Sequence, residues 1–168
     1  LSESSPNAAY HLQAHLAEHY DLDFGVGVSE PNSQDGKQST TVLWNKKTVS
    51  GEALAWPGDI PDWFRLTSHG HQPGDFADLG LEAVDGKIFD RYPGLFYFKA
   101  ARDNDQDPFT FLLVPLHLKA MSVGSKRRQL ASEILAAAVS VASEKLGEQD
   151  WVIGGDYNVA PMPIDVFD

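Results

Sequence analysis

An acid and an amide two residues apart, Asp156 and Asn158, are the side chains of this sequence best spaced for chemistry. They follow the apolar, β-favouring residues 151–153 and two glycines, which permit a sharp turn or the close approach of a ligand. In an extended segment, side chains two residues apart project from the same side and can act on one bound molecule. Gly, Asp and Asn are also typical of ordinary turns, so these residues alone leave both interpretations open.

A second apolar run, residues 109–116, ends in His117 and Lys119. A run that is apolar at almost every position is typical of a central strand buried on both faces. If this strand neighbours the strand at 151–153, its polar end and the end that carries Asp156 meet at one edge of a sheet. Imidazole, ammonium, carboxylate and amide groups are residue types that catalysis uses.

The longest predicted helix, residues 125–146, lies between these two strands and completes a strand–helix–strand unit. One face of the helix is traced by Leu130, Ile134, Ala138, Val141 and Lys145. The first turn carries Lys126, Arg127 and Arg128, and cations at a helix N-terminus oppose the helix dipole. This unfavourable placement favours an anionic partner at the start of the helix.

Residues 6–20 are predicted to form an amphipathic helix, and residues 24–28 a strand. The apolar residues that we expect to face the core recur at i, i+4 spacing and are Ala8, Leu12, Leu16 and Tyr20. Three histidines have the same spacing: His11, His15 and His19. They would suit a metal-binding face, but exposed histidines on a polar helix face are the commoner arrangement.

The strands that we expect in the middle of the chain come in pairs. Residues 40–44 and a short segment around Val49, joined by residues 45–47, indicate a hairpin. The aromatic residues 95–98 indicate another strand, which a turn rich in Asp and Asn, residues 103–107, connects to the apolar run at 109–116.

Residues 51–86 show no clear period, because Pro, Gly and Asp are mixed with aromatic residues. The aromatic residues named here are Trp56, Trp63, Phe64 and Phe76. We expect a long surface excursion that is held by its own aromatic anchors. His69 and His71 within it could ligate a metal, although histidines in a solvated loop are the commoner case.

Length and composition indicate one globular domain, residues 1–168, with 42% hydrophobic and 22% charged residues. We recognise no signal peptide and no apolar run that approaches a membrane span, so we expect a soluble chain and leave its compartment open. The absence of cysteine excludes disulfides and thiolate metal sites. The net charge of −11 disfavours wrapping of bare nucleic acid, unless a bound divalent cation and a local basic patch offset it.

Three segments in this order, residues 114–119, 126–129 and 152–158, resemble the endonuclease/exonuclease/phosphatase superfamily, which has the deoxyribonuclease-I-like fold. The shared pattern is a strand ending in His-Leu, an Arg-Gln on the next helix and a strand ending in Gly-Asp-x-Asn. Residues 41–44 and Arg91, which precedes the strand at 95–98, match weaker elements. The resemblance implies a four-layer α/β sandwich, with mixed sheets flanked by helices.

The resemblance also implies a metal-dependent hydrolase of phosphate esters. Asp156 would align or deprotonate the attacking water, and Asn158 would orient water and phosphate. His117 would contact the phosphate and stabilise charge in the transition state. Glu3, ahead of the first helix, stands in the place of the metal-binding glutamate and would hold Mg²⁺ or Mn²⁺ as a Lewis acid. Otherwise Glu3 is a helix-start acid that interacts with the dipole.

The substrate that the resemblance favours is DNA, cleaved at its phosphodiesters. The residues expected to bind the substrate phosphate are Lys119, Arg127, Arg128 and Arg91. The residues after Asp156 are similar to the exonuclease III branch, whereas His117 to Lys119 is closer to nuclease, phosphatase and sphingomyelinase-like members. The alternatives are a phosphodiesterase or phosphatase that acts on other substrates, and a non-catalytic binding or scaffold module on the same fold.

Two family elements have no match in the sequence. The family begins with a strand that bears an asparagine near the metal, and it ends with a strand that bears an Asp-His pair. We therefore expect a partial domain, in which catalysis is weak or absent. Open sheet edges would then favour association between chains or with a complementary segment.

Overall fold

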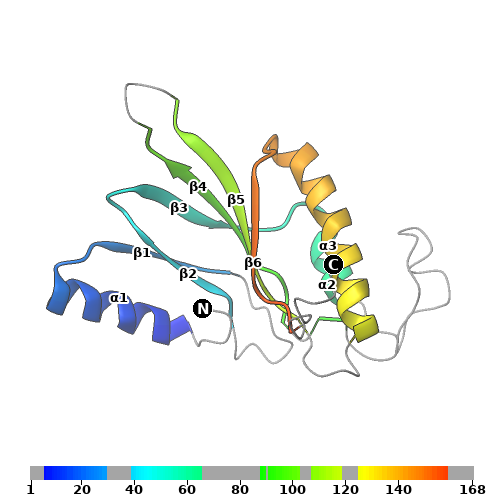
Figure 1. Ribbon diagram of the computed structural model, residues 1–168, viewed down its shortest axis with the longest axis horizontal. Coiled ribbons are helices and arrows are strands. Elements are labelled where there is room, and N and C mark those ends of the chain that lie inside the picture. The colour runs from blue at the N-terminus through cyan, green and yellow to red at the C-terminus, as the bar shows by residue number, and fades with distance from the viewer. Residues whose placement is uncertain are drawn as a thin grey trace, which may run out of the picture.

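The computed structural model describes residues 6–29, 39–65, 88–89, 91–102, 107–118 and 125–158. These ranges contain helices and strands in two sheets (Figure 1). The helices are α1 (Pro6–Tyr20), α2 (Ile60–Arg65) and α3 (Ser125–Leu146). The strands are β1 (Phe24–Val28), β2 (Thr41–Asn45), β3 (Val49–Leu54), β4 (Leu95–Ala100), β5 (Phe109–His117) and β6 (Trp151–Asp156). No helix within the described ranges combines the length and the apolar character needed to cross a membrane.

The larger sheet has the strand order β3-β4-β5-β6. Its first three strands pair antiparallel, and β4 and β5 are consecutive in the chain, as expected from the turn predicted at residues 103–107. β5 and β6 pair in parallel, which requires a crossover, and α3 supplies it. The strand–helix–strand unit predicted from the sequence is therefore confirmed, and it brings the carboxyl ends of β5 and β6 to the same edge.

The main core lies between the larger sheet and the helices α2 and α3. On β5, Leu112, Val114 and Leu116 are at most 2% exposed, whereas the residues between them are half-buried. The prediction of a strand buried on both faces is therefore wrong, because the face of β5 away from α3 is less completely covered. On α3 the predicted positions Leu130 and Ile134 are buried, but Lys145 is exposed at the end of the helix.

The smaller sheet pairs β1 with β2, and α1 packs against both strands (Figure 1). The rings of Trp44 on β2 and Phe98 on β4 meet edge to face at 5.4 Å and join the two sheets. A turn does follow β2, since the amide of Thr48 donates to the carbonyl of Asn45 at 3.1 Å. However, β2 pairs with β1 and β3 pairs with β4, so the predicted hairpin at 40–49 is wrong. The turn passes the chain from one sheet to the other.

The set of residues predicted to face the core on α1 is also wrong, because the buried side of the helix lies about one position further along the sequence. Leu12 is 39% and Tyr20 is 63% exposed, whereas Ala9 is fully buried. Gln13 shares the covered side, since its Nε2 donates to the carbonyl of Phe24 at 2.6 Å. A polar residue thus replaces an apolar one at the contact with the strand, which the hydrophobic spacing could not reveal.

Part of the predicted surface excursion belongs to the core. Residues 51–54 complete β3, and α2 follows shortly after. Trp56 and Phe64 are buried, as expected of aromatic anchors, and the Nε1 of Trp56 donates to the carbonyl of Pro93 at 2.8 Å. The excursion prediction is therefore wrong for residues 51–65. Residues 66–87, with Phe76, His69 and His71, lie outside the described residues.

Candidate functional site

The structure brings His117 and Asp156 together at the carboxyl ends of β5 and β6. The two residues are partners in the parallel register, and the amide of Leu118 donates to the carbonyl of Asp156 at 2.8 Å. The Nε2 of His117 lies 3.8 Å from the Oδ2 of Asp156. This separation is too long for a hydrogen bond and suits an ion pair when the imidazole is protonated. The predicted convergence of these two residues is confirmed.

The two side chains differ in their access to solvent. The side chain of His117 is 14% exposed and that of Asp156 is 53% exposed. The backbone amide of Asn158 donates to the Oδ1 of Asp156 at 2.8 Å, so one oxygen of the carboxylate is held by the following loop. The other oxygen is the one nearest His117. A carboxylate that is fixed on one side and accessible on the other can position a solvent molecule.

Asn158 connects the ends of the two strands. Its Nδ2 donates to the carbonyl of Leu118 at 2.7 Å, and its φ of 51° is a left-handed conformation that Asn tolerates. This hydrogen bond gives Asn158 a structural task that the sequence did not reveal. The predicted contact with water and phosphate stays a prediction, and it would use the amide oxygen or the second N–H of the same side chain.

Gly155 is required at its position for two reasons. Its φ of 141° lies in a region that side-chain-bearing residues rarely adopt, and a Cβ there would overlap the backbone oxygen of Leu116. Among the described residues, no atom lies within 4 Å of the corresponding position on Gly154. The sequence predicted a sharp turn or a ligand approach at these glycines. In the structure it is the backbone of the neighbouring strand that approaches Gly155 closely.

A cleft of about 670 Å³ lies between β2 and the ends of β5 and β6. The residues that line it are Thr41, Val42, Leu43, Leu113, Pro115, Leu116, Gly154, Gly155 and Asp156. Asp156 is the charged residue among these described lining residues, and the side chains of β2 and β5 make much of the remaining wall apolar. The carboxylate therefore faces a space large enough for a small ligand or for part of a larger one.

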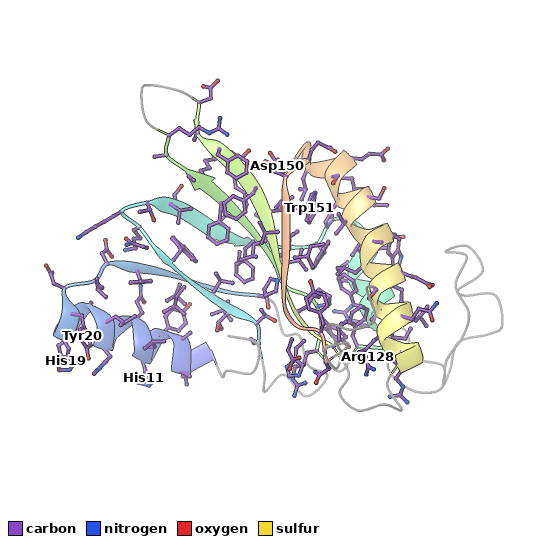
Figure 2. All side chains as sticks on the ribbon, viewed as in Figure 1. His11, His19, Tyr20, Arg128, Asp150 and Trp151 are labelled. Carbon is purple, nitrogen blue, oxygen red and sulfur yellow. The ribbon has the colours of Figure 1, made fainter. Side chains whose placement is uncertain are left out.

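The basic residues predicted to bind phosphate lie on other elements. Arg127 and Arg128 are half-buried in the first turn of α3, and Arg91 is half-buried ahead of β4. Figure 2 shows Arg128 at the end of the molecule where β6 terminates, with Asp150 and Trp151 at the opposite end of that strand. The phosphate-binding roles stay predictions. Glu3 and Lys119 lie outside the described residues.

The described residues do not show a complete metal site. Within the described ranges, no group of three or more His, Asp and Glu side chains could hold an ion. The sequence interpretation also gave no role to Glu30. β1 ends at Val28, whose partner Thr41 lines the cleft, and Glu30 follows two residues later in the sequence, outside the described residues. A polar residue at or just beyond the end of a strand is the kind of sequence signal that singled out His117 and Asp156.

The described residues of the three motifs on which the sequence resemblance rests lie on, or directly beside, three elements. β5, α3 and β6 carry the three motifs in that order. Comparisons with protein-family models, with curated proteins and with solved structures each found no match for this chain.

Proposed function

We propose that this chain is a metal-dependent hydrolase of phosphate ester bonds, with His117 and Asp156 at its centre. The observation that carries the proposal is their juxtaposition, 3.8 Å apart at the carboxyl ends of adjacent parallel strands. Asp156 also lines the cleft. A carboxylate and an imidazole so placed supply a base for water and a hydrogen-bond donor for a phosphoryl group.

Each residue has a separate task in this proposal. Asp156 holds the attacking water through its Oδ2, accepts its proton and keeps its Oδ1 on the amide of Asn158. His117 contacts a phosphoryl oxygen as negative charge develops there. The water oxygen bonds to phosphorus as the bond between phosphorus and the leaving oxygen breaks, and the leaving oxygen takes a proton from solvent. Asn158 keeps the two strand ends at the distance that this arrangement needs, through its bond to Leu118.

The donor set fits Mg²⁺ in part. Mg²⁺ keeps several waters and is commonly held by one or two carboxylates together with substrate phosphates, and Asp156 is an accessible carboxylate in the cleft. When bound, the ion supplies Lewis-acid polarisation of the phosphoryl oxygen. The second carboxylate would come from Glu3 or from Glu30. Glu30 fits the family placement at the end of a strand better, because it follows β1 in the sequence.

The arrangement of the described elements supports the finer fold proposal, a four-layer α/β sandwich. α1 packs on the sheet of β1 and β2, and Trp44 of that sheet packs on Phe98 of the larger one. α2 and α3 cover the opposite side of the larger sheet. A layer order of helix, sheet, sheet and helix would account for these placements, and the elements can be followed in Figure 1.

DNA is the first substrate to test, and a second candidate is a phosphodiester that carries an apolar group. The second candidate is favoured by the apolar side chains that line the cleft beside Asp156. The net charge of −11 also opposes a long polyanion more than a small substrate. The two substrates share the chemistry at phosphorus and differ in what occupies the cleft.

A substrate panel with Mg²⁺ tests the proposal. The tag-free chain would be assayed against duplex DNA, a chromogenic phosphodiester and a phosphodiester lipid, each with Mg²⁺ and with EDTA. Because we expect a partial domain, hydrolysis of at least one diester should be weak but detectable, and EDTA should abolish it. A folded chain that hydrolyses none of them with Mg²⁺ or Mn²⁺ would contradict the proposal and favour the non-catalytic binding module.

A further inference from the structure

The exposed side of α1 carries a pair of histidines in contact. The rings of His15 and His19 have their centroids 4.4 Å apart with an interplanar angle of 51°. Both residues are exposed, and the side chain of His19 is 52% exposed. Figure 2 shows His11 and His19 on the side of α1 turned away from the strands. The proposed hydrolytic site does not use these residues.

The spacing and separation of the two rings suit chelation. Histidines at i and i+4 on a helix share one face, and His-x-x-Glu-His is a spacing by which zinc enzymes hold their ion. Here that segment is His15, Leu16, Ala17, Glu18 and His19. Bonds of about 2.0–2.1 Å in a tetrahedral site place two ligand nitrogens about 3.3 Å apart. Rotation of two rings whose centroids are 4.4 Å apart can reach that separation.

We propose that His15 and His19 form a two-imidazole binding site for a divalent transition metal such as Zn²⁺, Ni²⁺ or Cu²⁺. Imidazole nitrogen suits these ions, whereas Mg²⁺ prefers oxygen, so the site is distinct from the one proposed at Asp156. The carboxylate of Glu18 lies 3.8 Å from the Nε2 of His19 and adds negative charge beside the cation. Water completes the coordination of the ion. Because the site lies on an exposed helix face and not in an enclosed cavity, the proposed site binds the metal and does not hold a substrate.

The residues around His15 indicate which two histidines bind the metal. His11 lies one turn before His15 and is exposed on the same helix. The ring of Tyr20 lies edge-on to His15, with centroids 5.9 Å apart, on the side towards the end of the helix. Because the observed ring contact joins His15 to His19, these two residues are the ligands, and His11 is a control from the same face.

Calorimetric titration of the tag-free chain with NiCl₂ tests the assignment. The parent should bind one Ni²⁺, and His15→Ala or His19→Ala should weaken binding by more than the roughly tenfold cost of losing an outer hydrogen-bond partner of a metal ligand. His11→Ala should change the affinity little. An absence of saturable binding in the parent, or an equal loss in His11→Ala, would overturn the assignment. With diamagnetic Zn²⁺ in place of Ni²⁺, the imidazole NMR resonances of His15 and His19 should shift, and resonances that stay in place would contradict the proposal.

Two controls separate this site from the hydrolytic one. A chain with both His15→Ala and His19→Ala should lose Ni²⁺ binding and keep its Mg²⁺-dependent hydrolysis, and its circular dichroism should show that the helix persists. Asp156→Asn should keep the parental Ni²⁺ affinity. Loss of Ni²⁺ binding in Asp156→Asn would place the ion in the cleft and overturn the proposal. The Ni²⁺ result is informative whether or not the hydrolase proposal holds.

Discussion

Leu112 and Leu113 are adjacent on β5, yet they face different environments. Leu112 is fully buried in the core against α3, whereas Leu113 is half-buried and lines the cleft. Successive side chains on a strand point to opposite faces, so His117 shares the face of Leu113. The same strand therefore stabilises the fold with one face and carries the candidate site with the other. Stability and chemistry can be altered separately by choosing the face.

The largest expected effect comes from the core face. Leu112→Ala should lower the free energy of unfolding by about 2–5 kcal/mol, because it leaves a cavity in a closed core. Leu113→Ala removes the same atoms from a face that is already open to the cleft, so it should cost less than about 2 kcal/mol. Urea unfolding of the two variants measures the difference. Equal costs would show that the cleft face is packed as tightly as the core.

The second prediction concerns the glycines before Asp156. Gly155→Ala should lower the free energy of unfolding by about 1–3 kcal/mol, because the backbone conformation is strained for alanine and the new Cβ meets the backbone of Leu116. Gly154→Ala should change the free energy of unfolding by no more than about 0.5 kcal/mol, since none of the described atoms lies near the added Cβ. Urea unfolding measures both. If Gly154→Ala lowered the free energy of unfolding more than Gly155→Ala, our account of the β5–β6 contact would be wrong.

The site was more predictable from the sequence than the arrangement of the sheets. The apolar runs of β5 and β6 and the long helix between them are strong local patterns, and a parallel pair joined by a helix forces His117 and Asp156 to one edge. The turn after β2 is also a local sequence pattern, and it was predicted. Which strand pairs with which is instead set by contacts between distant residues, such as that of Trp44 with Phe98. The role of Gln13 also depends on such a distant contact, its hydrogen bond to Phe24.

The third prediction tests the carboxylates that the described residues do not include. Glu3→Gln and Glu30→Gln each remove one candidate Mg²⁺ ligand while keeping the shape of the side chain. The variant that loses a ligand should need at least about tenfold more Mg²⁺ for half-maximal hydrolysis, as expected when a bond to the ion is lost. We expect this of Glu30→Gln more than of Glu3→Gln. Identical Mg²⁺ titrations in both variants and the parent would contradict a ligand role for either.

The fourth and smallest prediction concerns the start of α3. If Arg127 and Arg128 contact a phosphate backbone, replacing both by Ala should lower the slope of DNA affinity against salt by about two. Hydrolysis of a small chromogenic ester should then change little. Binding measured between low and moderate salt gives the slope. An unchanged slope, or equal losses on long and short substrates, would mean that the pair only supports the helix.

The most direct test of the central claim compares the two acids at the ends of β6. Asp156 is the last residue of β6 and faces the cleft, whereas Asp150 is exposed and directly precedes the strand, at its opposite end in Figure 2. On any phosphodiester that the parent hydrolyses with Mg²⁺, Asp156→Asn should lower the rate by at least roughly 10²-fold, as the loss of an acid–base group does. Asp150→Asn removes the same charge and should keep the parental rate. Parental activity in a folded Asp156→Asn variant, or an equal loss in Asp150→Asn, would contradict the assignment of Asp156 as the residue that activates water.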